Sequence, residues 1–304
     1  VTAGLGDIIR LRVRNLQRLV NYTKCLSDTG SPVTNCTEQE ISLYLDGREI
    51  KGLTPESGAP RPENEELQYH LQRTPESSEA WADLLGAPTA GPEFFVRPTE
   101  VSVGPSSTNS LHTEVGPMQF GLIRLRMNWF IGCSLLLLPV IGVFTWASRA
   151  SNLLRDPGPL PADNPKALRP YSLGRTQMAF WFFLVVVAFV YIWLVTGSSE
   201  SVTPSVLGLM GIGAGTALGA AVIDSNKQAT EMTSQTFLRD VLTDKNGYSF
   251  HRFQMFVWTI VLGALFVYSV WSRLAMPAFS GTLLALLGIS GGTYLGFKIP
   301  EQHT

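Results

Sequence analysis

Five long apolar segments dominate the pattern of hydrophobic and polar positions in the second half of the chain. They cover residues 128–147, 177–196, 205–223, 254–272 and 281–297 and contain almost no charged side chains. A helix rises about 1.5 Å per residue, so roughly 20 apolar residues cross a hydrocarbon layer about 30 Å thick. The pattern therefore predicts an integral membrane protein with five transmembrane helices.

The last four of these segments form an internal repeat. Residues 175–224 and 252–301 align at a constant offset of 77 without a gap, and 15 of the 50 aligned positions are identical. The identities fall into two blocks, one in each apolar segment of the unit, so each unit is expected to be a helical hairpin. Two hairpins of the same orientation predict a pseudo-twofold axis along the membrane normal.

The first hundred residues show the shorter periodicity of β-strands. Ile9, Leu11 and Val13 alternate with arginines in a strand predicted between Asp7 and Val20. A second alternating run, residues 40–53, contains Asp46-Gly47, a pair that favours a tight hairpin turn. Several short strands at this spacing predict a small β-sandwich, immunoglobulin-like in its general pattern.

These features divide the chain into seven parts. The polar segment before the first helix is rich in Gly, Pro, Ser and Thr and is interpreted as a linker. The expected order is a β-sandwich domain (1–104), a linker (105–126), the first transmembrane helix (127–148), a cytoplasmic linker (149–174), hairpin repeat 1 (175–224), a cytoplasmic loop (225–251) and hairpin repeat 2 (252–301).

Basic residues near the membrane predict the orientation. Most of them lie in 148–176, 225–253 and the C-terminal tail, whereas the short loops on the opposite side contain only Arg273, with Arg124 and Arg126 before the first helix. The positive-inside rule places the C-terminus in the cytoplasm and the β domain outside, in the periplasm if the source is bacterial. An outside location would allow a disulfide between Cys25 and Cys36, with two unpaired thiols as the alternative.

Small residues recur along one face of the third and fifth helices. They form a glycine-zipper pattern that lets helix backbones approach closely within or between chains, and the alternative is that they line a pore. Thr216 and Thr293 lie beside this face and are expected to bond to their own helix or to line a pore. The helix-packing or pore residues are Gly208, Gly211, Gly215, Thr216, Gly219, Ala285, Gly288, Gly292, Thr293 and Gly296.

Four charged residues mark equivalent positions at the cytoplasmic ends of the repeats. Arg175 and Arg252 open the second and fourth helices, and Asp224 and Glu301 end the third and fifth. Arg–carboxylate pairs at this level would join the hairpins, whereas the alternative is that each side chain extends separately into water.

Several chemistries find no support in the sequence. The net charge of −1 and the scattered basic residues indicate no nucleic-acid partner. No histidine lies within an apolar segment, so we expect no haem, metal or other cofactor. Ser290 lies in a G-x-S-x-G pattern without the preceding strand that a nucleophile elbow needs, and we expect no enzymatic activity.

The leading interpretation is a non-catalytic accessory subunit of a larger membrane complex. Its glycine-striped helices would pack against other subunits or copies of itself, and its outside β domain would contact a partner. The alternative is a homo-oligomeric channel whose pore is lined by the Gly/Thr faces. A short helix with Phe237, Leu238, Val241 and Leu242 on one side is expected between the repeats, against the membrane surface or a partner.

Overall fold

The computed structural model of the chain describes residues 1–27, 31–32, 36–56, 65–88, 91–106, 118–156, 168–199, 201–225, 233–244 and 247–299. Its contacts define two compact units. The first, here called the β unit, comprises Val1–Phe130, Trp193–Ser198 and Trp271–Leu274. The second, here called the helical unit, comprises Ile131–Ile192, Ser199–Val270 and Ala275–Thr304.

The larger sheet of the β unit has five strands in the order β1-β7-β6-β3-β4. Its central strand β6 (Val96–Pro105) pairs antiparallel with β7 (Gln119–Ile123) and with β3 (Ile41–Leu45). The short strands β1 (Thr2–Gly4) and β4 (Arg48–Glu49) form the edges, and β1 runs parallel to β7.

The hairpin between β3 and β4 forms where the sequence predicts it. Asp46 and Gly47 have φ angles of 50° and 75°, which a tight two-residue turn requires and an Asp-Gly pair tolerates. The segment interpreted as a linker differs from the prediction, because residues 119–123 of it form strand β7. This strand is short, and its pairing with β1 and β6 depends on residues far away in the sequence.

A second sheet consists of β2 (Ile8–Arg12) and β5 (Glu66–His70), which pair antiparallel. The strand predicted to reach Val20 ends at Arg12, and residues Leu16–Thr23 form helix α1 instead. Buried Leu16 and Val20 are four residues apart, a helical spacing that replaces the alternation of the strand. The sheet-rich character of this region is therefore confirmed, while the immunoglobulin-like sandwich stays a prediction.

Large aromatic side chains lie at the centre of the β unit. Trp81, on helix α2 (Ser78–Leu85), is fully buried and donates its indole N–H to the carbonyl of Gln72 at 3.1 Å. Tyr69 on β5 is also fully buried, donates to the carbonyl of Ile41 at 3.2 Å, and has its pKa raised by that burial. A one-turn 3-10 helix, η2 (Pro92–Phe94), precedes β6.

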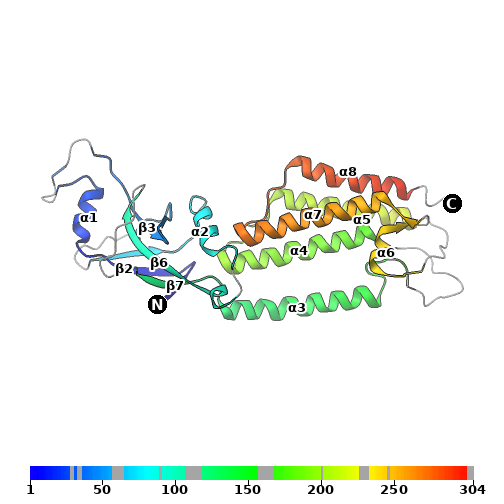
Figure 1. The fold of residues 1–304 in the computed structure, drawn as a ribbon, viewed down its shortest axis with the longest axis horizontal. Helices are drawn as coiled ribbons and strands as arrows, with labels where there is room; N and C mark the ends of the chain where they lie inside the picture. Colours follow the sequence, from blue (N-terminus) through cyan, green and yellow to red (C-terminus); the bar gives the residue numbers. More distant parts are fainter. Residues whose placement is uncertain are drawn as a thin grey trace. The chain divides into compact units, whose positions relative to one another are not determined.

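The helical unit contains long helices that run side by side (Figure 1). Within the described part of the chain, four are long and apolar enough to cross a membrane: α3 (Met127–Ala150), α4 (Leu173–Thr196), α5 (Pro204–Ser225) and α7 (Phe250–Arg273). The chain thus has the character of a membrane protein. Helix α8 (Gly281–Lys298) has only 18 residues and is made less apolar by its Gly, Ser and Thr residues and by Lys298.

The core of the helical unit is shared by α4, α5, α7 and α8. Trp181, Leu209, Phe266 and Leu287, one from each helix, are fully buried in a single cluster. Helix α3 contributes none of these residues and contacts α4 through Phe144 and Phe183, whose ring centroids are 4.6 Å apart. A short helix, α6 (Phe237–Leu242), and a two-stranded ribbon of β8 (Thr243–Asp244) and β9 (Gly247–Tyr248) connect the two hairpins.

Candidate functional site

Charged side chains meet at the end of the helical unit where α5 and α8 finish and α7 begins. The ammonium group of Lys298 lies 2.6 Å from a carboxylate oxygen of Asp224, 3.2 Å from one of Asp156 and 3.1 Å from the hydroxyl of Tyr294. The guanidinium of Arg252 lies 5.4 Å from the ring centroid of Tyr294. We call these five residues the helix-end cluster.

The cluster is almost entirely shielded from solvent. The side chains of Lys298 and Asp224 are 0% and 1% exposed, and that of Asp156 is 21% exposed. Arg252 and Tyr294 are also buried. A buried charge is costly unless it is paired, so the geometry of these contacts decides whether the cluster stabilises the unit.

The positions of these charges at helix ends explain why pairing stabilises them. Asp224 lies at the C-terminal end of α5, where the helix dipole is unfavourable to an anion, and Arg252 lies in the first turn of α7, where it is unfavourable to a cation. Lys298 ends α8, which suits its charge, and follows Tyr294 by one helical turn. Its ammonium therefore reaches Asp224 and offsets the unfavourable dipole there.

The charges of the helix-end cluster balance. Two carboxylates, of Asp156 and Asp224, face two cations, of Arg252 and Lys298. Burial raises the pKa of Asp156, but the positive charges of Lys298 and Arg252 outweigh it and hold that pKa below its usual range. All three N–H donors of Lys298 have acceptors, so its nitrogen is occupied as a protonated donor and is not presented as a nucleophile.

The residues predicted to form ion pairs have different kinds of partner in the structure. Asp224 pairs with Lys298, whereas Arg175 donates to the carbonyls of Asn152 and Leu153 at 3.4 Å each. Glu301 lies outside the described residues, so the pairing proposed for it stays a prediction. Sequence reasoning missed Lys298, which it counted only as a basic residue of the tail.

One signal in the sequence pointed to Lys298. The helices that end at Asp224 and at Lys298 finish on the same predicted side of the membrane with opposite charges. The contribution of Asp156 carried no such signal, because this residue follows α3 in a connection whose path the sequence does not specify.

The predicted glycine faces are split between internal packing and open surface. A Cβ placed at Gly208 or Gly219 would meet Leu284 or Leu295 of α8, at 3.5 and 2.8 Å. In the described part of the chain, no such neighbour lies within 4 Å of the Cβ position of the remaining glycines of the pattern, which are Gly211, Gly215, Gly288, Gly292 and Gly296. Ala285 is likewise exposed on α8.

Further close contacts between helices of the same chain use glycines outside the predicted pattern. The Cβ position of Gly291 lies 2.7 Å from the Thr216 hydroxyl oxygen, that of Gly263 lies 2.7 Å from the Phe180 ring, and that of Gly174 lies 3.2 Å from the Cα of Ala217. A side chain at any of these positions would push the helices apart. The internal seams of the unit are therefore distinct from the open glycine faces.

The two threonines beside the glycine faces bond to their own helices. Thr216 donates to the carbonyl of Ile212 and Thr293 to that of Ile289, each at 2.8 Å. Thr216 is buried against Gly291, while Thr293 is partly exposed. Of the two predicted roles, back-bonding is present in both, and the pore-lining role stays a prediction.

Two glutamines at equivalent positions of the repeats make hydrogen bonds between helices. The amide nitrogen of Gln177 donates to the hydroxyl of Thr259 at 2.9 Å, and that of Gln254 donates to the hydroxyl of Ser290 at 3.3 Å. Ser290 of α8, the residue of the G-x-S-x-G pattern, is 1% exposed and accepts the bond from Gln254 of α7. Its hydroxyl is therefore a packing group in this arrangement and is not open to a substrate.

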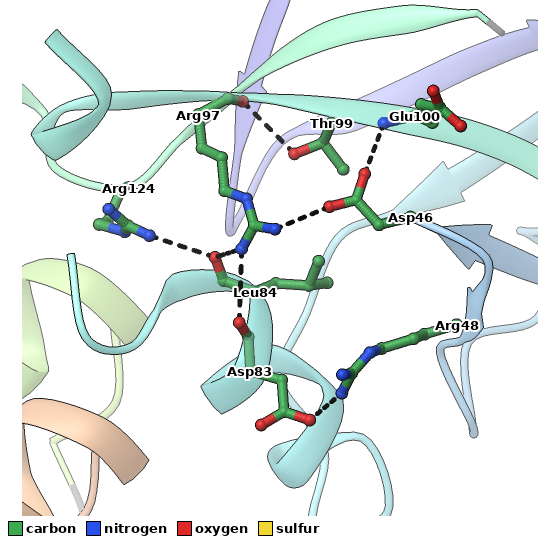
Figure 2. Close-up of polar contacts among 8 residues, drawn as sticks. All are labelled: Asp46, Arg48, Asp83, Leu84, Arg97, Thr99, Glu100 and Arg124. Atoms are coloured by element: carbon green, nitrogen blue, oxygen red, sulfur yellow. Dashed lines mark hydrogen bonds and ion pairs between the residues drawn. The ribbon is translucent and has the colours of Figure 1, made fainter. Parts of the chain in front are cut away.

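A second polar network lies in the β unit, around the C-terminal end of α2 (Figure 2). Arg97 donates to the carbonyl of Leu84 at 2.9 Å and pairs with Asp46 at 3.0 Å, and Arg124 donates to the same carbonyl at 3.3 Å. The last carbonyls of a helix have no partner within the helix and carry its negative dipole end, so two guanidinium groups satisfy them well. This network fastens α2 to the five-stranded sheet.

The predicted disulfide is confirmed. Cys25 and Cys36 are bonded, with their Cα atoms 5.6 Å apart, and Cys133 in α3 is free. Among the described residues, no three His, Cys, Asp or Glu side chains are grouped so as to hold a metal ion.

Comparisons of the chain with models of protein families, with curated proteins and with solved structures find no match.

Proposed function

We propose that this chain is a non-catalytic membrane subunit that associates with other membrane subunits through the exposed glycine faces of α5 and α8. The observation that carries the proposal is that Gly211, Gly215, Gly288 and Gly292 have open space at their Cβ positions. In this proposal α8 is a fifth transmembrane helix, the C-terminus is cytoplasmic, and the β unit lies outside and contacts a partner.

Faces of small residues have a specific role in the association of helices within a bilayer. Lipid tails are as apolar as leucine, so hydrophobicity alone does not bring helices together in a bilayer. Surfaces of small residues do so by close backbone approach, which adds dispersion and weak Cα–H contacts. Gly208 and Gly219 of the pattern lie against α8 of the same chain. The parts of these faces that stay open, at Gly211, Gly215, Gly288 and Gly292, are available to a second molecule.

The helix-end cluster supports a structural role. Its charges are balanced, and every donor of Lys298 has an acceptor inside the unit. Intramembrane charges of transporters face a substrate path or a water-filled cavity, whereas these charges join α5, α8 and Asp156 to one another.

A homo-oligomeric channel lined by the same faces is the alternative. The exposure of Gly211, Gly215 and Gly292 is compatible with a pore, but the hydroxyl of Thr216 is turned into the seam with α8 and bonded to its own helix. A pore wall here would therefore offer few polar groups to a permeating ion, and for that reason we favour the accessory subunit.

The first test is the mass of the native particle in nanodiscs, with every chain in it identified by mass spectrometry. We expect a particle heavier than this chain's 33.3 kDa that contains other membrane proteins. A particle holding one copy of this chain alone would refute the proposal, and a closed ring of this chain that conducts ions would establish the alternative.

Matched variants locate the interface. Gly215→Leu and Gly292→Leu should dissociate the particle, because each leucine keeps the backbones of the two molecules apart and is attached at a Cβ position that is open in this chain. Gly142→Leu on α3 is the control, since its Cβ position is also open and the substitution makes the same chemical change. Equal particle masses for all three variants would contradict the assignment of the interface to α5 and α8.

A further inference from the structure

The connection between the two hairpins is fixed to the helical unit on one side. Val241 of α6 is fully buried in a cluster with Leu173, Met255 and Tyr294. The carboxylate of Asp240 accepts hydrogen bonds from the hydroxyl of Ser234 at 2.6 Å and from the backbone N–H groups of Gln235 and Tyr171 at 3.0 and 3.3 Å. These contacts determine which way the connection faces.

Its other side exposes large apolar side chains. The two most exposed are Tyr248 and Phe250, at 80% and 78%, and Phe237, Leu238 and Phe253 are also exposed. Three of them, Tyr248, Phe250 and Phe253, line a hollow of about 280 Å³ together with Leu242 and Ser249. The predicted apolar side of the short helix is therefore divided, with Val241 facing inward and Phe237 and Leu238 facing outward.

The exposed side continues along a helix that is long and apolar enough to span a membrane. Phe250 and Phe253 are followed on α7 by Val257 and Ile260, which are also exposed. Their spacings of three, four and three residues place them on one face of the helix. The exposed apolar face of α7 therefore leads without interruption into the hollow.

We propose that residues 237–244 and 247–253 form an interfacial anchor that lies in the boundary between lipid headgroups and acyl chains, with acyl chains occupying the hollow. Aromatic side chains concentrate at this level of a bilayer, and short amphipathic segments bind there through their apolar face. The anchor requires that α7 crosses a membrane but does not depend on the proposed assembly role. It would fix the depth of α7 and of the helix-end cluster beside it.

Spin labels at two exposed positions test the anchor. Tyr248→Cys and Leu238→Cys are introduced in a Cys133→Ser background and labelled with a nitroxide, and the full chain is reconstituted in phosphatidylcholine–phosphatidylglycerol nanodiscs. The accessibility of each label to oxygen and to a water-soluble nickel chelate reports its depth. Met118→Cys in the β unit serves as the aqueous reference, and Leu136→Cys in the middle of α3 as the hydrocarbon reference.

We expect the ratio of oxygen to nickel accessibility at positions 238 and 248 to be several-fold above the value at 118 and below that at 136. A ratio equal to that at 118 would show that the segment is in water, and protection from both reagents would show that a protein covers it. Either result overturns the anchor. Neither affects the assembly test, which measures particle mass and uses different residues.

Discussion

Lys298 is the residue on which the buried charges of the helical unit converge. Its ammonium group is the common partner of Asp224, Asp156 and Tyr294, which come from three separate parts of the chain. A buried pair is a weak source of net stability, but the loss of one member is expensive because the other charge is left in a medium of low dielectric constant.

Lys298→Met tests this at the residue scale. We expect a loss of about 3 kcal/mol in the stability of the helical unit, because Asp224 loses its ammonium partner and the cluster acquires a net negative charge. The fall in melting temperature of the detergent-solubilised chain, followed by helical circular dichroism, measures it.

The double variant Lys298→Met/Asp224→Leu is the informative control. It removes one charge of each sign and leaves Asp156 and Arg252, so most of the lost stability should return. If the double variant melts as low as Lys298→Met or lower, the cost of that substitution does not arise from an uncompensated Asp224, and our account of the cluster fails.

At the scale of elements, helix α2 is held in place by hydrogen bonds to the carbonyls at its C-terminal end. Arg97 and Arg124 approach it from β6 and from the residue after β7, and both reach the carbonyl of Leu84 (Figure 2). The planar guanidinium of Arg97 spans two acceptors at once, the helix carbonyl and the carboxylate of Asp46.

Arg97→Ala should therefore loosen α2 by about 2 kcal/mol, the value typical of losing hydrogen bonds to a charged group. Hydrogen exchange of the amides of residues 78–85, measured by mass spectrometry on the full chain, should become faster by about tenfold or more.

Arg48→Ala provides the comparison within the same network. The pair of Arg48 with Asp83 is about half exposed, with side-chain exposures of 55% and 49%, and such pairs contribute about 0–1 kcal/mol. Similar acceleration of exchange in both variants would mean that capping by Arg97 is not what secures α2.

At the scale of the whole molecule, the orientation of the chain in the membrane decides which cellular compartment each unit faces. The disulfide between Cys25 and Cys36 agrees with an oxidising compartment for the β unit. The basic residues flanking the apolar helices favour the same arrangement, because cytoplasmic loops carry an excess of Lys and Arg.

An impermeant maleimide applied to intact cells tests this arrangement in the Cys133→Ser background. Met118→Cys in the β unit should react from outside, and Arg149→Cys at the end of α3 should react only after permeabilisation. Both positions are exposed in the structure, so a failure to react reflects compartment and not burial. The reverse pattern would invert the topology proposed for the chain.

The sequence by itself determined the features that depend on local pattern. Long apolar runs predicted α3, α4, α5 and α7, because a membrane-spanning helix satisfies its backbone hydrogen bonds internally. The Asp46-Gly47 turn was equally predictable, since the positive φ angles belong to the turn itself. The disulfide followed from two cysteines eleven residues apart in a polar β region.

Tertiary structure decided the features that depend on which distant residues meet. Pairing with β1 and β6 made residues 119–123 a strand, and the contact of α8 with α5 determined which glycines are covered and which are open. The partner of Asp224 was decided in the same way, because Lys298 is 74 residues away and reaches it only when the two helix ends lie together. Local pattern indicated only that the two helices end with opposite charges on the same predicted side. Whether these charges meet is set by the packing of whole elements.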